Sequence, residues 1–165
     1  TVPGFADIRP VLLDHMGAKH RKAVKGETDS EHVFHYFLSL IDDGSIDAEH
    51  DLLGAMERLV ADVVALAETH APGKKVGLNI MLSDGERLVG TRFNRSLYFV
   101  DRKGVYDCEI CGFPHIHHDP NTEYRAIVVA SEPLTHEDWI EIPNHSIWQL
   151  SMDSGINIHN LREYV

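Results

Sequence analysis

The sequence lacks several features that would place it in a particular class of protein. It has no apolar run near the roughly 18 residues of a membrane span, and its start has no signal-peptide pattern. Its only cysteines are Cys108 and Cys111, too few for a secreted disulfide framework. Basic residues are scarce, with 15 Lys and Arg against 26 Asp and Glu, for a net charge of −11. We therefore predict a cytoplasmic protein that binds neither nucleic acid nor a membrane, because like charges repel.

The composition is that of one folded domain. The chain has 165 residues, of which 43% are hydrophobic, and this is enough for one sizeable core. No internal repeat, low-complexity tract or linker rich in proline and serine divides it. We therefore predict a single domain over residues 1–165.

The first half of the sequence has the apolar spacing of helices, in which every third or fourth residue is hydrophobic. This spacing predicts a short helix over Ile8–Met16 and a second over Glu31–Gly44. A third, longer helix is predicted from about residue 48 to the Pro72-Gly73 pair, since proline and glycine end helices.

The second half has the pattern of short strands. Apolar residues alternate over Val76–Leu82, and the Asp84-Gly85 pair that follows is typical of a hairpin turn. Further strands are predicted at Leu88–Phe93, Ser96–Val100, Ala126–Ala130, Trp139–Ile142, Ser146–Met152 and Gly155–His159. Helices followed by mostly antiparallel strands indicate an α+β layered domain.

The segment Thr28-Asp29-Ser30-Glu31 has two interpretations. Ser or Thr followed three residues later by Glu is a capping box, in which Thr28 accepts the backbone N–H of Glu31 and the Glu31 side chain reaches back. The cap needs only Thr28 and Glu31, and it leaves Asp29 without a role. Asp29 could gain from the helix dipole alone, or it could present a carboxylate to an ammonium group.

Three segments together resemble one known family. They are VKGETDSEHVF at residues 24–34, LNIMLSDGERLVGTRF at 78–93 and YRAIVVASEPLTHEDWIEIP at 124–143. Their order and spacing resemble the class II glutamine amidotransferases, which are N-terminal-nucleophile hydrolases. Within that family the chain most resembles stand-alone γ-glutamyl hydrolases of the ergothioneine-pathway type.

The resemblance implies a four-layer αββα fold, with two antiparallel sheets and helices on their outer faces. In the family, the thiol of an amino-terminal Cys attacks a glutamine-type amide to form a thioester, and the free α-amine of that Cys is the base. An Arg holds the substrate carboxylate, and an Asn-Gly pair forms the oxyanion hole. The resemblance implies a small γ-glutamyl substrate and no required cofactor.

The resemblance also assigns site residues in this chain. The Asp of the family's Thr-Asp-Ser-Glu segment binds the substrate α-ammonium, and this role falls on Asp29. Thr28 caps the helix that presents Asp29, and Gly26 would allow the backbone to approach the ligand closely. The predicted substrate-binding residues are therefore Asp29, Thr28 and Gly26.

The start of the chain departs from the family. It begins with Thr1 in place of Cys, and residues 2–5 resemble the stretch that follows the family's oxyanion Asn-Gly pair. The resemblance therefore predicts the C-terminal portion of the amidotransferase domain, with no catalytic residue in this chain. The nucleophile would come from a missing N-terminal segment or a partner chain, and the chain alone would be inactive. The alternative is a non-catalytic, zinc-stabilised binding or partner module.

A cysteine- and histidine-rich segment follows in the second half. Cys108, Cys111, His115 and His117, with His118 next to them, are ligand types that zinc prefers. Four such ligands would make a structural zinc site, since no position is left open for water. The alternative is a polar hairpin with two cysteines and incidental histidines.

The zinc hypothesis predicts that the purified chain contains about one zinc ion per molecule, because four protein ligands close a structural site. Replacing Cys111→Ser should remove the metal and lower stability, since the ligands come together only in the folded state. Elemental analysis of both proteins checks this, and an unchanged zinc content in the variant would exclude Cys111 as a ligand.

Overall fold

The computed structural model describes residues 2–42, 52–105, 107, 110–113, 123–151 and 155–161. Four helices come first in these residues: α1 (Phe5–His15), α2 (Ala18–Ala23), α3 (Asp29–Asp42) and α4 (Leu52–His70). The apolar spacing correctly predicted α1, α3 and α4. It did not predict α2, because only His20 of its six residues is buried and so no apolar face is visible. None of the described helices is long and apolar enough to cross a membrane.

The described strands form two antiparallel sheets. The first has the order β1-β2-β6-β7, made from β1 (Met81–Ser83), β2 (Leu88–Arg92), β6 (Ser146–Ser151) and β7 (Gly155–Asn160). The second has the order β4-β3-β5, made from β3 (Tyr98–Lys103), β4 (Arg125–Ala130) and β5 (Ile140–Glu141). The α+β prediction with antiparallel sheets is therefore confirmed.

The first strand is shorter than predicted, since β1 contains only Met81–Ser83. The preceding residues still follow β2, because Leu78 donates its N–H to the carbonyl of Phe93 and Thr91 donates to the carbonyl of Ile80, both at 2.9 Å. The buried hydroxyl of Thr91 also donates to the Leu78 carbonyl at 2.7 Å, so a side chain replaces part of the backbone ladder. The four alternating apolar residues, Val76, Leu78, Ile80 and Leu82, lie in or against the core that the helices cover.

The predicted turn between β1 and β2 is present. Gly85 has a φ of 98°, a left-handed conformation that glycine adopts without strain. Asp84 accepts the backbone N–H of Arg87 at 2.7 Å and of Glu86 at 3.0 Å. These hydrogen bonds, that of Arg87 first, lower the pKa of Asp84 to about 2. Asp84 and Gly85 together therefore fix the hairpin.

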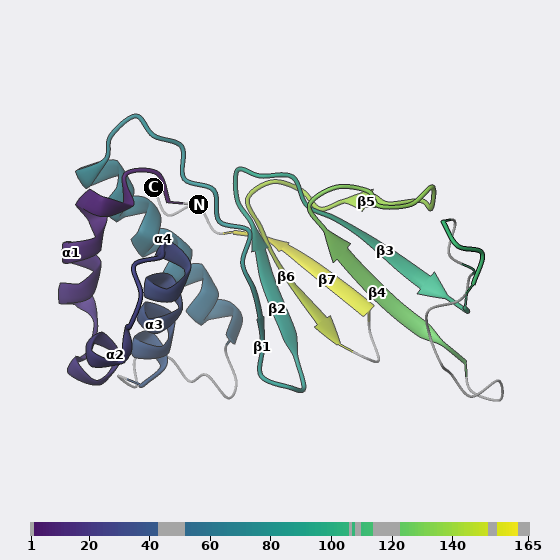
Figure 1. Cartoon of the computed structure of the whole chain (residues 1–165), viewed down its shortest axis with the longest axis horizontal. Helices are drawn as coiled ribbons and strands as arrows, with labels where there is room; N and C mark the ends of the chain where they lie inside the picture. The colour runs from purple at the N-terminus through teal and green to yellow at the C-terminus, as the bar shows by residue number, and fades with distance from the viewer. Residues whose placement is uncertain are drawn as a thin grey trace.

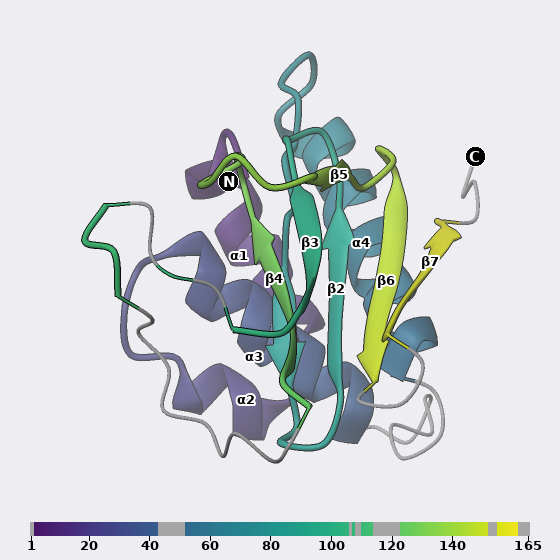
Figure 2. The same ribbon diagram turned by 90° about the vertical axis from the view of Figure 1, so that its right-hand side faces the viewer.

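The elements stack in three layers. Figure 1 shows the helices on one side, the four-stranded sheet in the middle and the three-stranded sheet on the other side, and Figure 2 shows the strands in front of the helices. One apolar core lies between the helices and the first sheet, and a smaller one, around Phe99, Ile142 and Trp148, joins the two sheets. Within the described residues helices cover one sheet face only, so the fourth layer implied by the resemblance remains a prediction.

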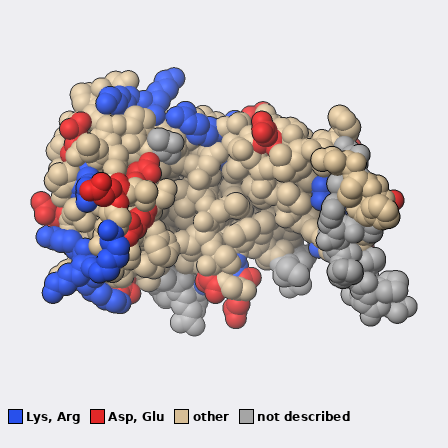
Figure 3. Space-filling model, viewed as in Figure 1, with Lys and Arg blue, Asp and Glu red and all other residues tan. Residues whose placement is uncertain are grey.

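Charged side chains are unevenly spread over the surface. On the face drawn in Figure 3 they gather over the helical layer and are fewer over the middle of the molecule. Basic residues group on α2, which contributes Lys19, Arg21 and Lys22. Two of them pair with acidic residues, Lys19 with Asp42 at 2.5 Å and Arg21 with Asp14 at 3.6 Å.

Gly90 leaves space for the Trp148 side chain on the neighbouring strand β6. It lies opposite Trp148 in the pairing of β2 with β6, and Trp148 is fully buried. A Cβ atom at position 90 would overlap the indole ring, and it would lie 2.6 Å from the carbonyl oxygen of Ile80. A glycine is therefore required at position 90, because any side chain would collide with the Trp148 ring and the Ile80 carbonyl.

Replacing Gly90→Ala should lower the free energy of unfolding by about 1–3 kcal/mol, because the added methyl group overpacks the sheet interface. Urea titration of the two proteins measures the difference. Gly17→Ala is the matched control, since a Cβ atom there lies 3.4 Å from Ser39 Oγ, and we expect a change within about 0.5 kcal/mol. Equal losses in both variants would contradict the packing explanation.

Candidate functional site

The site is built around the first turn of α3. The hydroxyl of Thr28 accepts the backbone N–H of Glu31 at 3.3 Å, as the capping spacing predicts. The Glu31 carboxylate reaches back further than Thr28, to the N–H groups of Lys25 at 2.7 Å and Gly26 at 2.8 Å. The cap therefore also fixes the chain that leads into the helix.

Gly26 lies against this carboxylate. A Cβ atom at position 26 would be 2.5 Å from Oε2 of Glu31, so any larger residue would displace the Glu31 side chain. This contact explains the glycine without a ligand. The close approach of Gly26 to a substrate, which the resemblance implies, remains a prediction.

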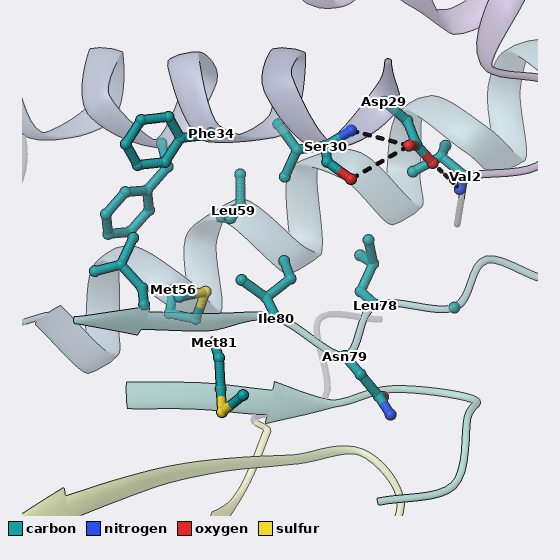
Figure 4. A pocket seen from close by; sticks show the side chains of 14 residues that line it. Val2, Asp29, Ser30, Phe34, Met56, Leu59, Leu78, Asn79, Ile80 and Met81 are labelled. Carbon is teal, nitrogen blue, oxygen red and sulfur yellow. Dashed lines mark hydrogen bonds between the residues drawn. The ribbon is translucent and has the colours of Figure 1, made fainter. Parts of the chain in front are cut away.

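The carboxylate of Asp29 is held by backbone donors on both oxygens. Oδ2 accepts the N–H of Val2 at 2.8 Å, and Oδ1 accepts the N–H of Ser30 at 2.9 Å. Figure 4 shows both contacts at one end of a pocket. Oδ1 also lies 3.5 Å from the Ser30 hydroxyl, which donates to it. A carboxylate oxygen has two acceptor positions, so Oδ2 keeps one for a further donor.

The pocket beside Asp29 has a volume of about 280 Å³. Its walls come from α3, α4 and residues 77–82, and they are mostly apolar. Phe34 and Met81 line it although they are 48% and 56% exposed. Among the described lining residues, Asp29 carries the only charge. The pocket therefore offers a carboxylate to a cationic group and apolar walls to a methylene chain.

His32 lies under this turn and has no role that the sequence revealed. It is fully buried, and its Nδ1 lies 2.8 Å from the carbonyl oxygen of Thr28. Its Nε2 accepts a hydrogen bond from Nε of Arg9 at 3.1 Å. These partners are 4 and 23 residues away in the sequence, and no short motif reveals the second contact.

The predicted zinc ligands lie mostly beyond the residues that the structure describes. Cys108, His115 and His117 are outside them, as is His118. Cys111 is described and exposed. Within the described ranges no group of three or more His, Cys, Asp or Glu residues could hold a metal ion, so the zinc site remains a prediction.

Most of the chain, including the segment that carries Asp29, matches one known protein family. The profile of the glutamine amidotransferases class-II matches residues 12–159, which is most of the chain and includes the start of α3. The chain belongs to the class-II glutamine amidotransferases. The resemblance carried by the three sequence segments is confirmed at the level of this family.

Named relatives of this class-II amidotransferase chain are longer than the chain itself. The probable glutamine amidotransferase DUG3 of Saccharomyces cerevisiae is 27% identical over 169 residues, covering 88% of this chain and 46% of the yeast protein. The uncharacterized protein MJ1515 of Methanocaldococcus jannaschii is 29% identical over 129 residues, covering 72% of this chain and 33% of the relative. The chain thus spans half or less of these two proteins.

A solved structure supports the fold. The glutamine aminotransferase class-II domain protein SPO2029 from Silicibacter pomeroyi superposes with a TM-score of 0.69 at 24% identity. The match covers 97% of this chain and 64% of that structure. The helices and sheets described above are therefore arranged as in a class-II amidotransferase domain.

Hydrogen bonds to Lys25 and Gly26 hold the pKa of Glu31 below its usual 4.5, the Lys25 bond first. A lowered pKa means that the ionised side chain stabilises the folded state, and that this contribution is lost as pH falls through the folded pKa. Glu31→Gln should therefore be destabilising near pH 7, with the difference from the unchanged chain shrinking below about pH 4.5.

Urea midpoints measured across this pH range check the prediction. Glu68→Gln, an exposed change on α4, controls for the removal of a surface carboxylate. A Glu31→Gln difference that stays constant with pH would contradict a role for the ionised side chain.

Proposed function

We propose that the chain contributes the substrate ammonium site to an enzyme that hydrolyses γ-glutamyl amides. The observation that carries the proposal is Asp29, a carboxylate fixed by two backbone N–H groups at the end of an apolar pocket. A γ-glutamyl group has an α-ammonium that can pair with this carboxylate, and its methylene chain can lie against the apolar walls. Such a pair orients the amide for attack.

The reaction that fits the family is acyl transfer through a thioester. The thiol of an amino-terminal cysteine would attack the amide carbon and lose its proton to the α-amine of the same cysteine. This α-amine then passes the proton to the departing ammonia or amine. Water would then attack the thioester and release glutamate and the thiol. By this route the complete enzyme is a hydrolase when the ammonia is released to solvent. It is a transferase when a second site uses the ammonia.

We propose that the nucleophile is supplied from outside this chain, by an N-terminal segment or a partner chain. Among the described residues of the pocket there is no cysteine, and no Lys or Arg to hold the substrate carboxylate. The edge strand β1 and the exposed Phe34 and Met81 would suit a covering segment. The chain by itself is then inactive.

The finer assignments are part of the same proposal. The likeness of the three segments together to γ-glutamyl hydrolases of the ergothioneine-pathway type supports a small γ-glutamyl substrate. The reaction needs no cofactor, and any zinc at Cys108 and Cys111 would be structural. The low number of cysteines supports a cytoplasmic setting.

The direct test replaces Asp29→Asn in the catalytically competent protein, meaning this chain together with the segment that supplies the thiol. The change keeps the size and removes the charge, so kcat/KM for glutamine should fall by the equivalent of about 2–3 kcal/mol. Steady-state kinetics measures the loss.

Thr28→Ala is the matched control from the same helical turn. It removes the cap and should cost about 1 kcal/mol of stability, while kcat/KM at a temperature where the protein is folded changes little. An Asp29→Asn variant that loses stability but keeps its kcat/KM would show that Asp29 only supports the helix start. That result would contradict an ammonium site at Asp29.

A further inference from the structure

Two hydrogen bonds and one contact between rings join the start of α1, and the residue before it, to the first turn of α3. Val2, just before α1, donates its N–H to Asp29 at 2.8 Å. Arg9 of α1 donates Nε–H to His32 at 3.1 Å, and the ring of Phe5 meets the His32 ring edge-on at 5.1 Å. The Asp29 contact and the His32 contacts therefore depend on one placement of α1 against α3.

His32 can make both of its hydrogen bonds in only one form. A guanidinium group donates and cannot accept, so Nε2 of His32 must be the unprotonated nitrogen that accepts from Arg9. Nδ1 then carries the hydrogen and donates it to the carbonyl of Thr28 at 2.8 Å. Because His32 is fully buried, the opposite tautomer would place a donor against the Arg9 guanidinium and an unprotonated nitrogen against the Thr28 carbonyl oxygen, and both contacts would be lost.

The other tie between these segments is weaker. Arg9 also approaches Glu27, with 3.4 Å between Nη1 and Oε1, but the Glu27 side chain is 86% exposed. An ion pair at such an exposed position contributes little. The buried hydrogen bond from Arg9 to His32 therefore fixes the position of α1 along the axis of α3.

We propose that His32 and Arg9 are positioning residues for the substrate ammonium site. They hold α1 so that the N–H of Val2 stays on one oxygen of Asp29, and they hold the Thr28 carbonyl at the turn from which Asp29 projects. This inference rests on the proposed function of Asp29. It adds that the ammonium site depends on one neutral tautomer of a histidine that does not contact the substrate.

The test is a double-mutant cycle in the catalytically competent protein. His32→Asn keeps an amide donor near the position of Nδ1 and removes the acceptor for Arg9, and Arg9→Met removes the donor but keeps an apolar stem. Each should raise KM for glutamine about 5- to 10-fold, with kcat changed less than about 2-fold. In an Asp29→Asn background the same changes should alter KM by less than about 2-fold.

Arg21→Met is the matched control. Arg21 of α2 pairs with Asp14 near the end of α1 at 3.6 Å, so this variant removes an arginine contact with α1 without changing a contact of His32. The kinetic constants should not change in this variant. Equal losses from His32→Asn with and without the Asp29 charge would show general structural damage and overturn the positioning role.

A second measurement keeps the inference separate from the proposed function. Nitrogen NMR of the His32 ring, on the otherwise unchanged protein, should show Nδ1 protonated and Nε2 unprotonated. A ring protonated on Nε2 would overturn the inference whatever the kinetics show. If the tautomer is as stated but Asp29→Asn leaves KM unchanged, the proposed function fails instead, and the positioning role fails with it.

Discussion

The first turn of a helix has backbone N–H groups without helical partners and a partial positive charge, and the structure at the start of α3 follows from satisfying both. Thr28 and Glu31 bind the free N–H groups of the turn and of the chain before it. Asp29 is then left as a side chain whose position is set by the backbone N–H groups of Val2 and Ser30. The sheets and the other helices matter to this site because they place Val2 and the apolar wall of residues 77–82 around it.

The elements that the sequence predicted are those that bury a regular apolar face. The helices α1, α3 and α4 have such faces. Among the strands β7 alternates over its middle residues, whereas β2 and β6 each have three consecutive buried residues and were predicted as short strands. The short α2 has one buried residue, so nothing in its sequence separates it from a loop. The strand predicted over Val76–Leu82 was too long, because Thr91 replaces part of its backbone pairing with a side-chain hydrogen bond.

The candidate site could be predicted in part. The position of Asp29 between two capping residues was visible in four consecutive letters, and the family likeness gave it a role. The contacts of Val2 with Asp29 and of Arg9 with His32 join residues 27 and 23 positions apart. They depend on how α1 packs against α3, which local patterns do not specify. Gly26 was expected to allow close approach of a ligand, and this stays a prediction, while a Cβ atom at this position would meet the Glu31 carboxylate.

A crystal structure of the catalytically competent protein with L-glutamate bound tests the central claim most directly. The account predicts the α-ammonium nitrogen within about 2.7–2.9 Å of an Asp29 oxygen, as in other charge-assisted hydrogen bonds. Val2 and Ser30 should still donate to the same carboxylate. An ammonium group bound elsewhere, with Asp29 contacting only Val2 and Ser30, would contradict the account.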